Sequence, residues 1–225
     1  MQILNCPALP PLVDDVYCWF ERMATESPDR LRNFEQAVGA STPDEKQFLD
    51  VTGVPMRSYV DSPVHRLLDA MMGLLDANLD ALSRVVLPTG PPLRDLLARP
   101  DDHVLRLSRY PATDVLVVNH PHTDIDLLTM LPGATAPGLE IQSADGWRSV
   151  VPTREEVVVL AGEFIELFGG VTADVHRVAG TTIARMSISF FVNAEPDLAI
   201  ADRTVRAIIN DRLAAVSGQG TPKDL

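Results

Sequence analysis

The sequence has almost no cysteine and very little lysine. Its two cysteines, Cys6 and Cys18, are too few for a disulfide framework or a cysteine-rich zinc site, so we expect a reducing, cytoplasmic setting. Only Lys46 and Lys223 are lysines among 19 basic residues, a bias that favours a bacterial gene of high GC content. Long apolar runs are also absent, and the first residues do not resemble a signal peptide. We therefore expect neither a membrane span nor secretion.

Positive charge is scarce relative to negative charge. The chain carries 31 acidic and 19 basic side chains, a formal net charge of −12. An acidic field of this kind repels phosphate groups, which argues against nucleic acids and anionic membranes as partners. A small molecule is the expected partner, and the sequence does not reveal the oligomeric state.

The first hundred of the 225 residues have the apolar spacing of helices. Helices are predicted over Leu12–Ala24, from Ser27 to about Val38, and over His65–Val86. Ser27-Pro28 and Ser62-Pro63 are typical of helix N-termini. In the last helix, leucines and methionines form a broad stripe that we expect to be core. Residues 1–102 are thus predicted to form a helical region that packs on the part that follows.

Residues 103–200 have a different pattern of short segments rich in Val, Ile and Phe, separated by Gly, Pro and Asp. Nine strands are expected here, with FIELF (164–168) among them, and no helices between them. This pattern is typical of a sandwich, a jelly roll or a barrel. A last helix over Arg203–Val216 and a tail complete the chain as segment 201–225.

The residues that could carry chemistry lie in the strand-rich part. In an extended segment, His122 and Asp124 point to the same side and can chelate one metal ion. His176, in a later predicted strand, is the candidate for a third ligand. Two imidazoles and one carboxylate leave open positions on an octahedral ion, the arrangement suited to non-haem Fe(II) and O2. The alternative is two structural histidines, one in a turn and one in a strand.

A possible anion receptor follows His176. Arg185 and Ser187 share one face of a predicted strand, where a guanidinium and a hydroxyl can receive a carboxylate. Apolar residues flank the arginine on both sides, so a buried anionic partner is expected, and a dicarboxylate co-substrate would serve. The alternative is a surface arginine paired with an acidic side chain.

Taken in order, these segments resemble the isopenicillin N synthase-like branch of the Fe(II)/2-oxoglutarate oxygenases. The resemblance covers roughly residues 103–200. Its segments are LRLSRYP (105–111), HTDIDLLTMLPGATAPGLEIQSADGW (122–147), VVLAGEFIELFGG (158–170), HRV (176–178) and RMSISFFVNAEPD (185–197). The family's patterns at these places include H-T-D, H-R-V and R-x-S.

The resemblance implies a fold, a set of cofactors and a role for each matching residue. It implies a mainly β double-stranded β-helix, or jelly roll, buttressed by helices. His122, Asp124 and His176 match the iron ligands, which are also the catalytic residues. Arg185 and Ser187 match the pair that binds the distal carboxylate of the co-substrate 2-oxoglutarate, and Tyr110 matches a tyrosine that often joins that site. O2 would be the second co-substrate.

The sequence also departs from the family in several places. Ser108 stands where asparagine is usual, and the family's N-terminal segment, with its own opening strand, is expected to be largely missing. His120 and Asp126, close to the predicted ligands, are expected to be structural rather than reactive.

The predicted function is oxidation of a C–H bond of a small molecule, by hydroxylation, desaturation or cyclisation, in bacterial specialised metabolite biosynthesis. Two alternatives remain open. One is an Fe(II) oxidase of the isopenicillin N synthase type that uses no 2-oxoglutarate. The other is a non-catalytic binding protein on the same barrel.

Overall fold

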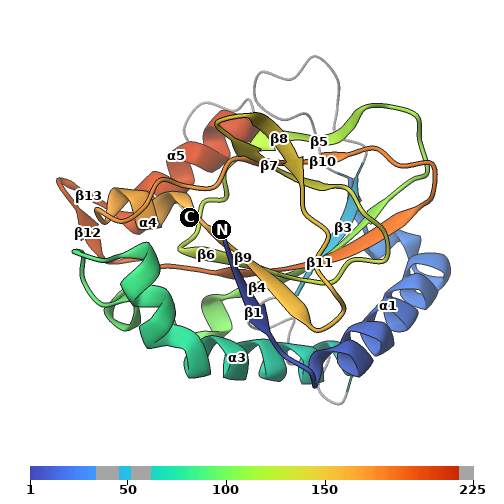
Figure 1. Cartoon of the computed structure of the whole chain (residues 1–225), viewed down its shortest axis with the longest axis horizontal. Coiled ribbons are helices and arrows are strands. Elements are labelled where there is room, and N and C mark those ends of the chain that lie inside the picture. The colour runs from blue at the N-terminus through green and yellow to red at the C-terminus, as the bar shows by residue number, and fades with distance from the viewer. Residues whose placement is uncertain (34–45, 52–61, 218–225) are drawn as a thin grey trace.

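The chain folds around two antiparallel β-sheets that face each other. A computed structural model describes residues 1–33, 46–51 and 62–217. Figure 1 shows the two sheets as opposite walls, with helices outside the larger one. This is the jelly-roll architecture, mainly β with few helices, that the sequence predicts.

The larger sheet contains strands from both halves of the chain. Its order is β1-β9-β6-β11-β4-β3-β2. The strands are β1 (Gln2–Asn5), β9 (Glu156–Ala161), β6 (Leu128–Pro132), β11 (Arg185–Val192), β4 (Val104–Tyr110), β3 (Gln47–Val51) and β2 (Arg32–Asn33). Most neighbours in this order are far apart in sequence, so the sheet brings together residues that no local pattern connects.

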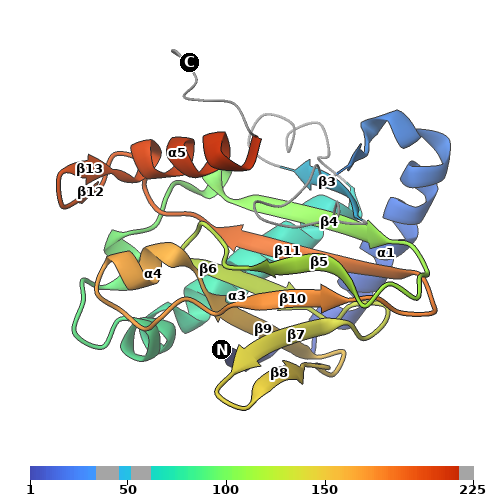
Figure 2. The same ribbon diagram turned by 90° about the horizontal axis from the view of Figure 1, so that it is seen from above.

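The smaller sheet has the order β5-β10-β7-β8. Its strands are β5 (Val117–His122), β10 (His176–Ala179), β7 (Leu139–Ser143) and β8 (Gly146–Ser149). Figure 2 views the molecule from the side of this sheet and shows β10 between β5 and β7. The placement of β10 beside β5 determines where His176 lies.

Two long helices, α1 (Leu9–Glu26) and α3 (Pro63–Val86), cover the outer face of the larger sheet. The Ser62 hydroxyl accepts a hydrogen bond from the backbone N–H of His65, which confirms the predicted helix start. The leucine and methionine stripe of α3 lies in one core cluster with residues of α1, β4 and β11. Each fully buried leucine contributes about 1.5–3 kcal/mol to this packing.

Strand β11 connects this core to the interior between the sheets. Ile188, Phe190 and Val192 are fully buried in the cluster with the helices. Arg185 and Ser187 lie on the opposite face and line a cavity between the two sheets. Because side chains alternate between the two faces of a strand, one face of β11 packs in the core and the other faces the cavity.

The N-terminal region is less helical than the sequence predicts. β1 pairs with β9, and β3 pairs with β4, so an opening strand is present after all. The helix predicted from Ser27 is only a 3-10 turn (Pro28–Arg30), followed by β2, and residues 34–38 lie outside the described part. The segment that forms β1 is too short to show a clear strand pattern. A local pattern also cannot reveal a partner strand some 150 residues away.

The segment FIELF was predicted as a strand and is a helix, α4 (Glu163–Leu167). Phe164 and Ile165, adjacent in sequence, are both buried, whereas a strand would point them to opposite faces. The backbone N–H groups of Glu163 and Phe164 donate to the carbonyls of Asp124 and Asp126. These bonds hold the first turn of α4 against the loop that carries Asp124.

The remaining elements are short or terminal. They are the 3-10 helices Leu93–Asp95 and Pro100–Asp102, the hairpin β12 (Ala199–Ile200) and β13 (Arg203–Thr204), and α5 (Val205–Ser217). Residues 218–225 of the predicted tail lie outside the described part. Among the helices that are described, none has both the length and the apolar character needed to cross a membrane. The division of the chain at residues 102 and 200 stays a prediction.

Candidate functional site

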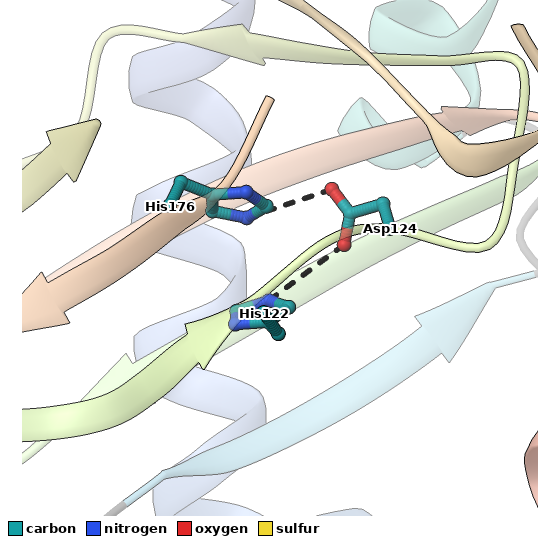
Figure 3. Close-up of side chains that lie close together, drawn as sticks. All are labelled: His122, Asp124 and His176. Carbon is teal, nitrogen blue, oxygen red and sulfur yellow. Dashed lines mark ion pairs between the residues drawn. The ribbon is translucent and has the colours of Figure 1, made fainter. Parts of the chain in front are cut away.

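Three side chains converge where the ends of β5 and β10 meet. His122 is the last residue of β5, His176 is the first residue of β10, and the two are paired across the strands. Asp124 follows β5, and its carboxylate faces both rings from one side, as Figure 3 shows. Its carboxylate oxygens are 3.7 Å from His122 Nε2 and 3.6 Å from His176 Nε2. The three ligand atoms lie within 4.8 Å of one another, close enough to hold one metal ion.

Hydrogen bonds determine which ring nitrogens face Asp124. His122 Nδ1 is 2.6 Å from the His120 carbonyl oxygen, and His176 Nδ1 is 3.1 Å from the Asp174 carbonyl oxygen. A carbonyl can only accept, so each Nδ1 carries the proton and donates. Each Nε2 then has a lone pair directed toward the carboxylate, the tautomer that binds a metal.

The charges of this cluster suit a cation. Burial lowers the pKa of His122 to about 4, helped by the neighbouring charge of His176. Burial also opposes ionisation of Asp124, but the two histidines and a hydrogen bond from Thr129 outweigh it and lower the pKa of that carboxyl. Near neutral pH, His122 therefore presents a neutral nitrogen and Asp124 a carboxylate.

A chain of hydrogen bonds supports Asp124 from behind. Thr129 Oγ1 lies 2.5 Å from Asp124 Oδ2 and 2.8 Å from Asp126 Oδ2. A hydroxyl has one proton and can donate only once. Burial, and then the charge of Asp124, raises the pKa of Asp126 well above its usual range. The geometry fits a protonated Asp126 that donates to Thr129, which in turn donates to Asp124.

Replacing Thr129 with valine keeps the shape of the side chain and removes the hydroxyl that orients Asp124. We expect metal affinity to fall about 10- to 100-fold, the usual effect of losing a group that supports a ligand. Anaerobic Fe(II) titration measures this affinity. Thr129→Ser is the matched control and should stay close to the unchanged protein. Equal affinity in Thr129→Val and Thr129→Ser would show that the hydroxyl does not orient the carboxylate.

A second cluster lies at the start of β11. Arg185 and Ser187 are each 6% exposed, and they pair across the strands with Tyr110 and Ser108 of β4. Arg185 Nε donates to the Ala136 carbonyl oxygen at 3.1 Å, and its Cζ is 5.2 Å from the centroid of the Tyr110 ring. Arg185 Nη1 is buried and has no hydrogen-bond partner among the described residues. An unsatisfied buried cation of this kind calls for an anionic ligand.

Gly138, just before β7, makes room for Arg185. Its φ is +146°, a conformation that L side chains rarely adopt. A Cβ at this position would lie 3.2 Å from Arg185 Cδ and 3.3 Å from Arg185 Nε. The glycine therefore permits the orientation of the guanidinium.

One cavity of about 280 Å³ connects the two clusters. Its lining includes His122, Asp124 and His176 from the first, and Arg185 and Ser187 from the second. A ligand can thus contact a metal ion at one end and the guanidinium at the other. The arrangement can hold a cation and a carboxylate-bearing molecule side by side.

Residues singled out in the sequence behave differently in the structure. Those predicted as ligands and anion receptors lie together, and their roles stay predictions. Asp126 is 1% exposed and contacts Thr129, in keeping with a structural role, and the His120 carbonyl contacts His122.

Sequence reasoning missed Thr129, although a polar residue inside the apolar run LLTML was an available signal. It also missed Lys46 and Arg106 in the cavity lining.

Part of the chain matches a known family, and solved structures share its fold. Residues 101–194 match the family model described as the 2OG-Fe(II) oxygenase superfamily. Gibberellin 3-beta-dioxygenase 3 of Arabidopsis thaliana is 29% identical over 177 residues, which are 72% of this chain and 48% of that protein. Isopenicillin N synthase of Streptomyces jumonjinensis is 30% identical over 78 residues, 32% of this chain and 23% of that protein. The chain thus spans about half the length of the first of these relatives, and the match to the second covers less.

Two solved structures have the same fold. A full-length protein of Neurospora crassa, solved in complex with alpha-KG, superposes with a TM-score of 0.72 at 17% identity, and the match covers 94% of this chain and 85% of the other. The dioxygenase for auxin oxidation 1 of Arabidopsis thaliana, in a binary complex with 2-oxoglutarate, has a TM-score of 0.66 at 17% identity. That match covers 87% of this chain and 83% of the other.

Proposed function

We propose that this protein is an Fe(II)/2-oxoglutarate-dependent dioxygenase. The premise is the match of residues 101–194 to the 2OG-Fe(II) oxygenase superfamily. Its substrate would be a small molecule, oxidised at a C–H bond by hydroxylation, desaturation or cyclisation. One observation carries the proposal. The His-Asp-His cluster and Arg185, whose buried Nη1 has no hydrogen-bond partner among the described residues, line the same cavity.

The residues present fit both groups. His122, Asp124 and His176 would hold Fe(II), since two imidazoles and one carboxylate are the donor set this ion takes in such enzymes. Arg185 and Ser187 would bind the distal carboxylate of 2-oxoglutarate. The positive charges of Fe(II) and Arg185 then balance the negative charges of Asp124 and the dicarboxylate, which makes the buried assembly neutral.

When bound, iron with 2-oxoglutarate and O2 supplies the oxidising power to break an unactivated C–H bond, and succinate and CO2 are the coproducts. The protein's own residues do the positioning. Thr129 orients the Asp124 carboxylate, and the Nδ1 hydrogen bonds keep both imidazoles in the metal-binding tautomer. Leu139 and Val178 contribute apolar surface to the cavity, which limits access of water to the reacting groups.

The setting that we propose is specialised metabolism in a bacterium. The support for a bacterial gene is the amino-acid usage of the chain, with two lysines among 19 basic residues. The acidic charge of −12 supports a small-molecule substrate over a nucleic acid.

The test is an anaerobic Fe(II) titration followed by addition of 2-oxoglutarate, observed by visible absorption. A metal-to-ligand charge-transfer band that appears only after the second addition supports the proposed dioxygenase. Iron binding without the band would favour the oxidase of the isopenicillin N synthase type. If the described cluster takes up no iron, the non-catalytic binding protein becomes the better account.

A further inference from the structure

On one side of the cavity, cations contact aromatic rings. Lys46, Arg106 and Phe191 line the cavity, and Phe48 and Asp50 contact Arg106. We call these five residues the Arg106 wall. Arg106 Cζ lies 4.4 Å from the Phe48 ring centroid and 5.2 Å from the Phe191 ring centroid. Lys46 Nζ lies 6.0 Å from the Phe48 ring centroid. Contact with two rings restrains the guanidinium.

Asp50 holds Arg106 by one edge. Arg106 Nε donates to Asp50 Oδ1 at 2.6 Å, and Nη2 donates to Asp50 Oδ2 at 2.9 Å. A guanidinium has five N–H donors, so Nη1 and the second proton of Nη2 are not used by this pair. Arg106 is 23% exposed and lines the cavity. A rigid donor edge is thus available to a ligand.

Strand register places this wall near the metal cluster rather than near Arg185. Arg106 is four residues from Tyr110 along β4, about 13 Å in an extended strand. Tyr110 is the residue that pairs with Arg185. Phe191, which contacts Arg106, pairs with Thr129, and Thr129 is hydrogen-bonded to Asp124. A molecule on the Arg106 wall would therefore lie beside the metal end of the cavity.

The charge of the wall is opposite to that of the protein. Lys46 and Arg106 bring two positive charges to the wall, and Asp50 brings one negative charge. Among the described residues that line the cavity, Asp124 is the one acidic side chain, against Lys46, Arg106, Arg154 and Arg185. In a chain of net charge −12, such a lining marks the cavity as a receptor for anions.

We propose that the Arg106 wall is the substrate subsite and that it selects a small organic acid by its carboxylate. This rests on the proposed dioxygenase, because it assigns Arg185 to 2-oxoglutarate and the Arg106 wall to the molecule to be oxidised. The substrate carboxylate accepts hydrogen bonds from the guanidinium of Arg106 and is attracted by the positive charge of Lys46. Phe48 and Phe191 pack against the guanidinium. The carbon skeleton then extends toward the metal cluster.

The test compares acids with neutral molecules of the same shape. The probes are benzoate, hexanoate and 3-phenylpropanoate, each beside its primary amide, and binding is measured by saturation-transfer NMR with the iron-loaded, 2-oxoglutarate-bound protein without O2. We expect at least one acid to bind about tenfold or more tightly than its amide, as a charge-assisted hydrogen bond implies. Equal affinity in every pair, or no binding by any acid, would overturn the proposal.

Two variants locate the acid. Arg106→Gln combined with Asp50→Asn removes both members of the pair, so that no carboxylate is left without its cation. This double variant should lose the acid preference about tenfold or more and keep the charge-transfer band of 2-oxoglutarate. Arg109→Gln, at an exposed arginine on the same strand, is the matched control and should keep the preference.

The variants also separate this proposal from the proposed function. If the unchanged protein shows no charge-transfer band with 2-oxoglutarate, the proposed dioxygenase is contradicted. If the double variant still prefers acids over amides, only the assignment of the Arg106 wall to the substrate is contradicted. If the double variant loses the band as well, Arg106 belongs to the co-substrate site, and the assignment of the wall to the substrate is wrong.

Discussion

Replacing His176 with alanine is expected to reduce Fe(II) affinity on the order of a thousandfold, and with it all oxidation of 2-oxoglutarate. The expected size of this loss of affinity follows from dividing the binding free energy of a typical protein metal site among its few ligands. His176 is 6% exposed, and its Nε2 lies 3.6 Å from Asp124, so no other described side chain takes its place in the cluster. Anaerobic equilibrium dialysis with Fe(II) measures the loss.

His120→Ala is the matched control for this substitution. His120 is only two residues from His122 in the same strand, and its contact with that ring is through the backbone carbonyl, which alanine preserves. Fe(II) affinity should therefore stay near that of the unchanged protein. A comparable loss in both variants would mean that the dialysis reports damage to the fold, which far-ultraviolet circular dichroism would reveal.

The second large effect is expected at Arg185. In Arg185→Leu, Fe(II) should still bind, but the charge-transfer band with 2-oxoglutarate should be lost, with an affinity at least about a hundredfold weaker. The reason is that the guanidinium is buried with Nη1 unsatisfied, so the dicarboxylate loses its charged partner. Arg177→Leu removes an arginine that pairs with Glu140 and does not line the cavity, and it should keep the band.

Gly138→Ala tests the same site without changing its charge. The added Cβ would lie 3.2 Å from Arg185 Cδ in a backbone conformation of φ +146°. We expect weaker 2-oxoglutarate binding with Fe(II) binding preserved, measured by titrating the same absorption band. Unchanged affinity in both Arg185→Leu and Gly138→Ala would refute the assignment of this end of the cavity to the co-substrate.

Much of the fold could be predicted because its signals are local. The stripe of α3 and the period of two in β11 each span only one element, and both patterns persist in the structure. The placement of His122 and Asp124 on one side also needed only local alternation. The contribution of His176 did not follow from spacing, because it depends on the pairing of β10 with β5.

What the sequence could not supply were contacts between distant strands. Lys46 and Arg106 join one cavity only because β3 pairs with β4, and no pattern in either segment indicates that partner. Thr129 supports Asp124 through side chains alone. In α4, two adjacent residues are buried and the first turn forms backbone hydrogen bonds to the Asp124 loop, so the apolar composition of FIELF was misleading.

The pairing of β1 with β9 has a consequence for how the protein is made. Gln2 leaves the ribosome long before its partner Val159, because most of the chain lies between them. A contact this distant in sequence slows folding, since a long loop must close before the strands can join. Until then one edge of β9 is exposed, and an unpaired edge recruits strands from other chains. Deleting residues 1–5 should therefore promote aggregation during synthesis more than it lowers the activity of molecules that have folded.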